Sequence, residues 1–270
     1  MNQKRHVTVL DFDHTYDSQP FLHNNEYDWI DFTRLRGTKK YCEEYSLSTI
    51  YEKIRKKENN GITFIGSGDY HYVTYLLLSN VRVPFTLVLF DHHTDLLKSP
   101  LSDFITCGSW GLHAIEQLKL LKKVIIIGVN PELIKTIPPH VAHKVTIFPN
   151  TPFSLNKKII YKQILQQIPT RTVYISIDKD VLNRNDAITN WDQGDLHLSF
   201  LNETIQLISN YKTIEGVDIC GESPPSHTQS FSVNGNNPHE INSKTNKQIL
   251  DGLLSIMDKN SFTPNQVDYH

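Results

Sequence analysis

The stretch Phe85-Thr-Leu-Val-Leu-Phe90 runs directly into Asp91-His92-His93-Thr94-Asp95, and this junction decides how the chain can fold. A continuous apolar run of this length is typical of a strand covered on both faces, as in a parallel sheet. Because successive side chains of an extended segment point to opposite sides, Asp91, His93 and Asp95 are expected to share one side. The stretch therefore predicts a buried strand that ends in metal-ligand residue types.

A second junction of the same kind occurs later in the chain. The run Thr172-Val-Tyr-Ile-Ser-Ile177 is followed by Asp178-Lys179-Asp180, whose two carboxylates are again expected on one side. Carboxylates and imidazoles suit Mn²⁺, Fe²⁺ or Zn²⁺ better than an ion that prefers thiolates. Either cluster alone has a structural alternative, because Asp also caps helices and forms turns. Together they favour a metal site, since clustered like charges need a cation among them.

The composition limits the classes of partner and the compartment. The 270 residues are 39% hydrophobic and 21% charged, with a formal net charge of −2, so no nucleic-acid partner is indicated. No apolar stretch reaches the roughly 20 residues of a membrane span, and nothing resembles a secretion signal. The three cysteines, Cys42, Cys107 and Cys220, are odd in number and widely spaced. This argues against a disulfide framework and predicts a cytoplasmic protein.

Strand-like and helix-like patterns alternate along the chain. The alternation predicts an α/β fold of three α-β-α layers with a mostly parallel central sheet, in a single domain over residues 1–270. The expected strands are His6–Phe12, Ile62–Gly66, Phe85–Asp91, Lys123–Val129, Val145–Pro149, Thr172–Asp178 and Thr213–Cys220. The expected helices are Ser46–Lys57, Leu155–Ile168, Ser199–Asn210 and Thr245–Met257.

Polar residues follow five of these strands. In open parallel sheets, ligands bind beyond the carboxyl ends of the strands, so these residues predict a site at that edge. The polar stretches Asp17–Lys40, Asn183–Leu196 and Glu222–Asn242 are expected to form loops over it. The residues expected at the edge are Asp11–His14, Asp69–His71, Asp91–Asp95, Asp178–Asp180 and Glu222.

Four sequence elements resemble the ureohydrolase family of arginases and agmatinases, over about residues 60 to 225. The family has a Gly-Gly-Asp-His-like turn, then Asp-Ala-His-x-Asp, Ser-x-Asp-x-Asp, and a late strand ending in Asp-x-x-Glu and Pro. The first and fourth elements are one residue longer here than the usual form. The matching segments are Gly66-Ser67-Gly68-Asp69-Tyr70-His71, Asp91-His92-His93-Thr94-Asp95, Ser176-Ile177-Asp178-Lys179-Asp180 and Asp218-Ile219-Cys220-Gly221-Glu222-Ser223-Pro224.

The resemblance implies a centre of two Mn²⁺ ions per chain, with Asp91 and Asp178 shared by both ions. Two such ions lower the pKa of a water held between them, and Asp180 would orient that water toward a guanidinium carbon. Glu222 would hold the guanidinium, whose N–H donors match a carboxylate. The residues implied as ligands are His71, Asp91, His93, Asp95, Asp178 and Asp180.

A proton must reach the leaving amine, and a histidine with a near-neutral pKa suits this role. His113 is the first candidate, because it follows Cys107-Gly108-Ser109-Trp110, where the family often has a Ser-Gly-Asn-x-His run. His92 and His14 are the alternatives. His14 and Asp11 are also expected to line the edge where substrate binds.

One departure from the family bears on the substrate. Arginases that act on free arginine bind its α-carboxylate through an Asn two residues after the second element, where this chain has Leu97. A pocket open at that end would accept arginine within a peptide, as in the peptide arginases, which convert arginine residues to ornithine. The aromatic and acidic loop Asp17–Lys40 would supply a surface for the peptide. A small guanidino substrate of the arginase or agmatinase type is the alternative, and a homo-oligomer is left open.

Two other functions compete with this one. Asp11-Phe12-Asp13-His14-Thr15 imitates the Asp-x-Asp-x-Thr turn of haloacid-dehalogenase-type phosphatases, in which the first Asp attacks phosphorus and Mg²⁺ binds the pair. That function leaves Asp91–Asp95 unexplained. The other is a non-catalytic metal-binding protein on the same fold, since fold alone does not fix function.

Overall fold

The computed structural model describes residues 6–24, 26–55, 61–100, 104–150, 157–224 and 237–262, with side chains as far as residue 257. The strands in these residues are β1 (Val7–Asp11), β2 (Asp28–Asp31), β3 (Tyr41–Cys42), β4 (Ile62–Phe64), β5 (Phe85–Phe90), β6 (Ile105–Thr106), β7 (Leu121–Val129), β8 (Val145–Pro149), β9 (Thr172–Asp178) and β10 (Thr213–Cys220).

Eight of these strands form one sheet, in the order β2-β1-β4-β10-β9-β5-β7-β8. Every pairing between neighbours in this sheet is parallel. The remaining two, β3 and β6, form a separate antiparallel pair. Parallel neighbours need long crossover connections, which helices supply here, so the carboxyl ends of the strands all lie at one edge.

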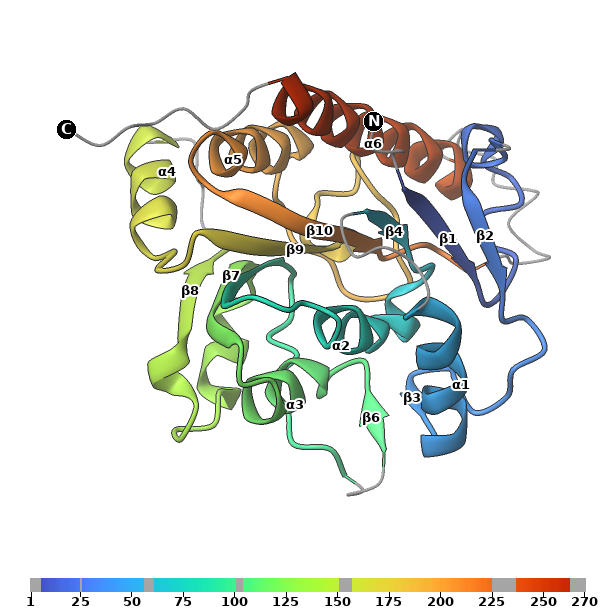
Figure 1. Cartoon of the computed structure of the whole chain (residues 1–270), viewed down its shortest axis with the longest axis horizontal. Helices are drawn as coiled ribbons and strands as arrows, with labels where there is room; N and C mark the ends of the chain where they lie inside the picture. The colour runs from blue at the N-terminus through green and yellow to red at the C-terminus, as the bar shows by residue number, and fades with distance from the viewer. Residues whose placement is uncertain are drawn as a thin grey trace.

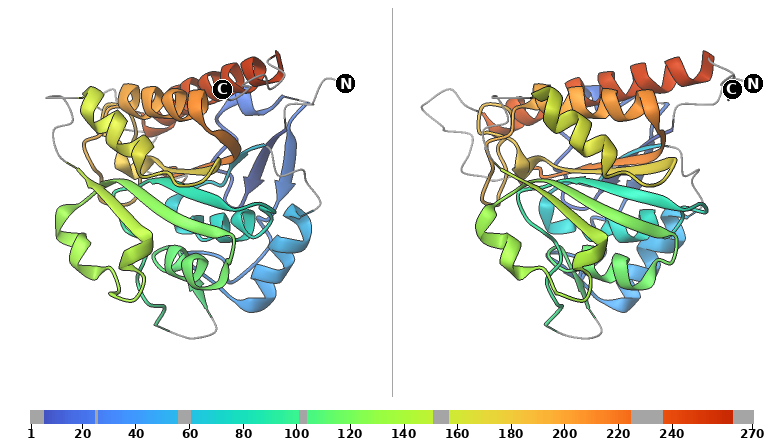
Figure 2. Two further views of the ribbon diagram at one scale, coloured as in Figure 1. Left: turned by 60° about the vertical axis from the view of Figure 1, so that its left-hand side comes forward. Right: turned by 90° about the vertical axis from the view of Figure 1, so that its left-hand side faces the viewer.

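Helices cover both faces of the sheet. Figure 1 shows α4, α5 and α6 on one face and α1, α2 and α3 on the other, and both views of Figure 2 show the same three layers. The predicted three-layer α/β fold is confirmed. The helices are α1 (Glu44–Ile54), α2 (Val73–Leu78), α3 (Trp110–Gln117), α4 (Lys157–Gln166), α5 (Leu198–Tyr211) and α6 (Pro238–Phe262), with 3₁₀ helices η1 (Pro20–Leu22), η2 (Gly68–Tyr70), η3 (Pro131–Thr136), η4 (Ala142–Lys144) and η6 (Lys179–Val181).

The apolar run of β5 explains why its strand is central. Phe85, Leu87 and Leu89 belong to one hydrophobic cluster, whereas Val88 and Phe90 belong to the cluster on the opposite face. Alternate side chains thus enter two different cores, and each buried Leu or Phe contributes about 1.5–3 kcal/mol. This is the physical reason that the sequence shows no polar alternation in this strand.

The structure also differs from the predicted elements. All seven predicted strands are found, but Asp17–Lys40 is not simply a loop, because it contains β2 at the edge of the sheet. Its Phe32 is buried and packs in the core, so it offers no surface to a peptide. Helices α2 and α3 were not predicted, and α6 begins at Pro238, seven residues before the predicted Thr245. Most of the predicted loop Glu222–Asn242 lies outside the described residues.

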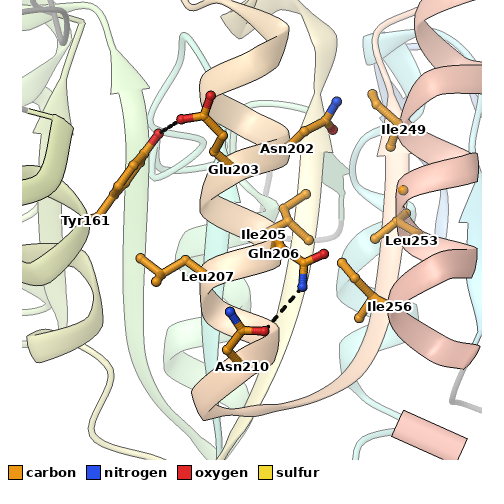
Figure 3. A pocket seen from close by; sticks show the side chains of 11 residues that line it. Tyr161, Asn202, Glu203, Ile205, Gln206, Leu207, Asn210, Ile249, Leu253 and Ile256 are labelled. Carbon is orange, nitrogen blue, oxygen red and sulfur yellow. Dashed lines mark hydrogen bonds between the residues drawn. The ribbon is translucent and has the colours of Figure 1, made fainter. Parts of the chain in front are cut away.

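A groove of about 500 Å³ lies between α5 and α6 (Figure 3). Its apolar lining comes from residues such as Ile205, Ile249 and Leu253. Its one carboxylate, Glu203, accepts a hydrogen bond from Tyr161 at 2.5 Å, so the described lining holds no cluster of catalytic groups. None of the described helices is both long and apolar enough to cross a membrane.

Candidate metal centre

The carboxyl ends of β5, β9 and β10 lie level with one another. Phe90 of β5 pairs with Ile177 of β9, and Asp178 of β9 pairs with Cys220 of β10. Asp91, the residue after Phe90, therefore lies level with Asp178, the residue after Ile177. The two acidic clusters, which lie far apart in sequence, therefore meet at one edge of the sheet. Parallel pairing in register is what brings them together.

His71 lies among three of the acidic residues. Its Nδ1 atom is 3.0 Å from Oδ2 of Asp95, 3.4 Å from Oδ2 of Asp178 and 3.5 Å from Oδ2 of Asp91. The turn that carries His71 begins at Gly66, whose φ of 111° favours glycine. It continues into η2, where the Ser67 side chain accepts a hydrogen bond from the backbone N–H of Asp69. The 3₁₀ turn absorbs the extra residue in this element.

The ring of His71 is oriented by a relay behind it. Its Nε2 atom lies 2.9 Å from the Ser176 hydroxyl, which in turn donates to Oδ1 of Asp218 at 2.7 Å. Since the hydroxyl proton goes to Asp218, the serine oxygen accepts from Nε2–H, which assigns the tautomer from the network. Nδ1 is then the atom left to bind a cation at the carboxylates.

His93 forms a second group of ligand types with Asp91 and Asp180. Its Nδ1 atom is 2.9 Å from Oδ2 of Asp180 and 3.5 Å from Oδ1 of Asp91. On the other side of the ring, Nε2 lies 2.9 Å from Oδ1 of Asp192. Asp91 thus touches both histidines, one through each carboxylate oxygen, and is placed between the two groups.

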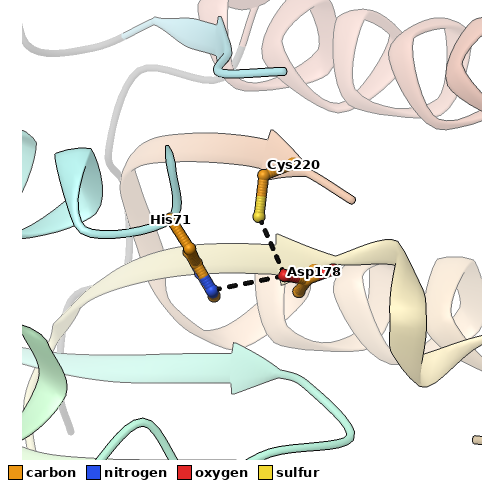
Figure 4. A group of neighbouring side chains, drawn as sticks. All are labelled: His71, Asp178 and Cys220. Atoms are coloured by element: carbon orange, nitrogen blue, oxygen red, sulfur yellow. Dashed lines mark hydrogen bonds and ion pairs between the residues drawn. The ribbon is translucent and has the colours of Figure 1, made fainter. Parts of the chain in front are cut away.

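Cys220 also faces this centre, as Figure 4 shows. Its thiol is buried and donates to Oδ2 of Asp178 at 3.2 Å. The next residue, Gly221, has a φ of 86°, and a Cβ there would lie 2.4 Å from Oδ1 of Asp178. Only glycine therefore lets β10 end this close to the Asp178 carboxylate.

The carboxylates crowd one another in a buried place. Burial, with the charges of Asp95 and Asp180, raises the pKa of Asp91 well above its ordinary value. Burial and the charge of Asp180 raise the pKa of Asp178 to about 6. Burial alone would lower the pKa of His71, but the hydrogen bond and charge of Asp95, with Asp178 and Asp91, raise it to about 10. The pKa values of both acidic groups are raised because burial disfavours the charged form and neighbouring carboxylates repel it.

The donor set fits divalent ions. Oδ2 of Asp91 is buried and accepts no hydrogen bond from the described residues, which is costly unless a cation binds there. Oxygen donors dominate each group and imidazole nitrogen completes it, a mixture that suits Mn²⁺, Fe²⁺ or Zn²⁺. The structure brings together the six predicted ligand residues: His71, Asp91, His93, Asp95, Asp178 and Asp180.

A cavity of about 290 Å³ opens onto this centre. Its outer lining is mainly apolar and hydroxyl-bearing, and includes Leu97, Leu133 and Trp191. The carboxylates among the described lining residues are the candidate metal ligands Asp95, Asp178 and Asp180. The full lining is Gly68, His71, His93, Thr94, Asp95, Leu97, Thr106, Cys107, Gly108, Leu133, Thr136, Asp178, Asp180 and Trp191.

Glu222 is not placed to hold a guanidinium group, which corrects the expectation from the sequence. It is fully buried, does not line the cavity, and its carboxylate forms an ion pair with Lys179. The extra residue in the fourth element is the reason. An insertion of one residue at a strand end turns the next side chain to the opposite face.

His113 is also not placed at the centre. It is exposed on α3, packs edge-on against Tyr75 at 4.7 Å between ring centroids, and lines a neighbouring groove rather than the cavity. The extra residues before it, relative to the family run, put it on the outer side of α3. It therefore has no described path for a proton to the centre.

The remaining candidates lie near the edge but outside the lining of the cavity. His92 is buried, its backbone N–H donates to Oδ1 of Asp180 at 3.1 Å, and burial with the neighbouring His93 lowers its pKa. His14 adopts a left-handed φ of 61°, and its backbone N–H donates to Asp11 at 2.8 Å. Asp11 and His14 thus stabilise their own turn, and neither lines the cavity.

Two residues of the predicted loop Asn183–Leu196 join the site without having been singled out. Asp192 contacts His93, and the Trp191 indole N–H donates to Oδ1 of Asp69 at 3.1 Å. The sequence signal was weak, namely an aromatic and an acidic residue in a polar stretch. Their roles depend on how the loop returns over the strand ends, which local patterns do not encode.

Comparisons with known proteins agree with this fold. The Arginase family model matches residues 5–234. A Thermotoga maritima protein of uncharacterised function is 31% identical over 225 residues, covering 82% of this chain and 81% of that protein. Formimidoylglutamase from Bacillus subtilis has a TM-score of 0.69 at 14% identity, covering 98% of this chain and 90% of that one. The agmatine ureohydrolase of Thermoplasma volcanium has a TM-score of 0.66 at 18% identity, covering 95% and 92%.

The fold and the family match define the class of protein, a hydrolase of the C–N bonds of linear amidines. The chain belongs to the arginase family, whose model covers most of its length. The structural neighbours are below 20% identity and by themselves show the fold alone. Membership of the arginase family argues against the alternative function, a phosphatase that uses Asp11 and Asp13.

Proposed function

We propose that the protein is a two-manganese hydrolase that cleaves a guanidino group and releases urea. The observation that carries this proposal is the position of Asp91, whose two oxygens face His71 on one side and His93 on the other. Two groups of ligands joined by one carboxylate suit a pair of ions rather than one. His71, Asp91, Asp95 and Asp178 would hold one ion, and Asp91, His93, Asp178 and Asp180 the other.

The chain's own residues have separable roles in this reaction. When bound, the two ions would activate a water for attack on the guanidinium carbon. The reaction consumes one water and breaks one C–N bond of the guanidinium cation. The oxygen of the water becomes the urea carbonyl and gives up both of its protons, and the leaving nitrogen gains two protons and departs as an ammonium group. Asp180 lines the cavity beside His93, and we assign it the task of orienting the water and carrying a proton from the water to the leaving nitrogen.

The substrate we favour is an arginine residue within a peptide, which would become ornithine. What supports this is Leu97, whose side chain is half exposed and lines both the cavity and an adjoining groove of about 420 Å³. A chain attached to the guanidino group would leave the centre past Leu97 and lie in that groove. Leu97 offers no hydrogen bond to the α-carboxylate of a free amino acid.

A substrate panel tests the proposal. Purified protein is loaded with Mn²⁺ and incubated with free arginine, agmatine and an arginine-containing peptide with blocked termini, and urea and metal content are measured. Urea from the peptide supports the full proposal, whereas urea from free arginine alone contradicts the peptide substrate. No urea from any guanidino compound, with less than one ion bound per chain, would favour a non-catalytic protein. A cytoplasmic location, a homo-oligomer and a single domain over residues 1–270 remain predictions.

A further inference from the structure

Lys179 lies between the candidate metal ligands Asp178 and Asp180, yet its side chain is among the largest that are fully buried. Long cationic side chains are almost never fully buried without a partner, because removing the charge from water is costly. The partner here is Glu222, which is also fully buried and forms an ion pair with the Lys179 ammonium. The ion pair between Lys179 and Glu222 is thus part of the buried structure directly behind the candidate metal centre.

Two amide side chains complete the group. The Gln19 amide donates to Oε2 of Glu222 at 3.2 Å, and the Asn246 amide donates to Oε1 at 2.6 Å. The same Asn246 amide also lies 2.8 Å from Oε1 of Gln19. Both amide side chains are fully buried. The quartet of Lys179, Glu222, Gln19 and Asn246 therefore ties the ends of β9 and β10 to α6 and to the segment before η1.

The quartet also reaches the turn that carries His71. The backbone N–H of Glu222 donates to the carbonyl of Gly66 at 3.0 Å, and the backbone N–H of Gly66 donates to the Tyr16 hydroxyl at 2.8 Å. At the other end, Asp178 accepts a hydrogen bond from the backbone N–H of Asp180 at 3.0 Å, which fixes the turn around Lys179. One buried ion pair thus connects the segments that supply three of the six ligands.

We propose that Lys179 and Glu222 are positioning residues that set the spacing of Asp178, Asp180 and His71, and that Glu222 does not contact the substrate. This rests on the proposed function and deepens it. The described cavity lining then contains no carboxylate besides the candidate metal ligands.

The test compares four variants with the wild-type protein: Glu222→Gln, Lys179→Met, the double variant Lys179→Met with Glu222→Met, and the remote control Glu203→Gln. Mn²⁺ affinity is measured by calorimetry on folded protein, and KM and kcat are measured at saturating Mn²⁺. Each single variant should lose about 10–100-fold in Mn²⁺ affinity, the usual effect of removing support for a metal ligand. The double variant should recover part of that loss, because neither charge is left alone. Glu203→Gln should match the wild type.

Separate results would overturn the inference. A Glu222→Gln variant with normal Mn²⁺ affinity and a KM raised a hundredfold would return Glu222 to the substrate. Folded variants with unchanged Mn²⁺ affinity, differing only in melting temperature, would reduce the pair to a general structural role. If a single variant does not fold, Lys179→Arg and the double variant still allow the affinity comparison. Absence of urea release in the wild type would contradict the proposed function alone, since the affinity measurements need no turnover.

Discussion

Nε2 of His71 lies 2.9 Å from the hydroxyl of Ser176, so the imidazole is held from behind while Nδ1 faces three carboxylates. Ser176 stands two residues before Asp178 on β9 and has its side chain on the same face. The strand that supplies candidate metal ligands thus also orients a candidate ligand from another segment. Such outer hydrogen bonds fix both the tautomer and the direction of a metal-binding histidine.

Ser176→Ala should weaken Mn²⁺ binding by about 10–100-fold, because the imidazole loses the acceptor that fixes its orientation. Chelator competition on the purified protein measures the change. Ser209→Ala is the matched control, since the Ser209 hydroxyl bonds within α5, to the carbonyl of Gln206. Equal affinity in Ser176→Ala and the wild type would show that the relay does not support the ligand.

Asp91→Asn should reduce the metal content to less than one ion per chain, because one residue contributes to both groups of ligands. Elemental analysis after dialysis measures the bound metal. Asp11→Asn should keep the wild-type metal content and urea release, since Asp11 lies outside the cavity lining. The reverse pattern, with function lost in Asp11→Asn and kept in Asp91→Asn, would restore the phosphatase alternative.

The metal-free protein should become less stable as the pH rises. The pKa of Asp178 is raised from 3.8 to about 6 by burial and Asp180. The pKa of His71 is raised from 6.5 to about 10 by Asp95, Asp178 and Asp91, against the effect of burial. In both cases the folded state binds more protons than the unfolded state, so this stabilisation is present at low pH. It is lost between about pH 4 and 6 for Asp178, and between about pH 6.5 and 10 for His71.

Urea denaturation of metal-free protein at several pH values checks this sign. Added Mn²⁺ should restore stability increasingly toward high pH, because the ion competes with protons for the same atoms. Stability of the metal-free protein that rises steadily from pH 5 to pH 8 would contradict the prediction. The Asp91→Asn variant should show a weaker pH dependence, because it has lost one of the shifted carboxyl groups.

Asp192→Asn should lower Mn²⁺ affinity by about tenfold, the lower end of the usual range for such support. The loss is expected to be small because the Asp192 side chain is 65% exposed, so water competes for its contact with His93. Calorimetry measures the affinity, and Asp195→Asn in the same loop is the control. A loss as large as that of Asp91→Asn would mean that Asp192 is itself a ligand.

His113→Ala should leave kcat within about twofold of the wild type, the usual effect of a surface change far from the reacting atoms. Initial rates of urea release over a pH series provide the measurement. A loss above tenfold, together with a lost limb of the pH profile, would restore His113 as the proton donor.

Local patterns were sufficient for seven of the eight strands of the main sheet and for the acidic residues that follow β5 and end β9. The apolar runs before Asp91 and Asp178 specify buried parallel strands, because burial on both faces demands such runs. Period-two alternation predicts that the carboxylates share a side, but Asp95 has a positive φ and Asp180 lies in η6, so their directions are not set by an extended strand. The short helices α2 and α3 and the edge strand β2 escaped prediction, since tertiary packing rather than local periodicity stabilises elements of so few residues.

The sequence by itself determined the layered α/β fold, the edge at which the site lies and the residue types that gather there. Tertiary structure alone decided whether the other polar residues near this edge, such as Glu222 and Asp192, face the centre. Gly221, with its positive φ, directs Glu222 away from the cavity and onto Lys179, whereas the return of the loop brings Asp192 to His93. The physical reason is that a strand fixes the side-chain direction by local geometry. At turns and loops, one residue more or less changes that direction, and only the packed surroundings select the result.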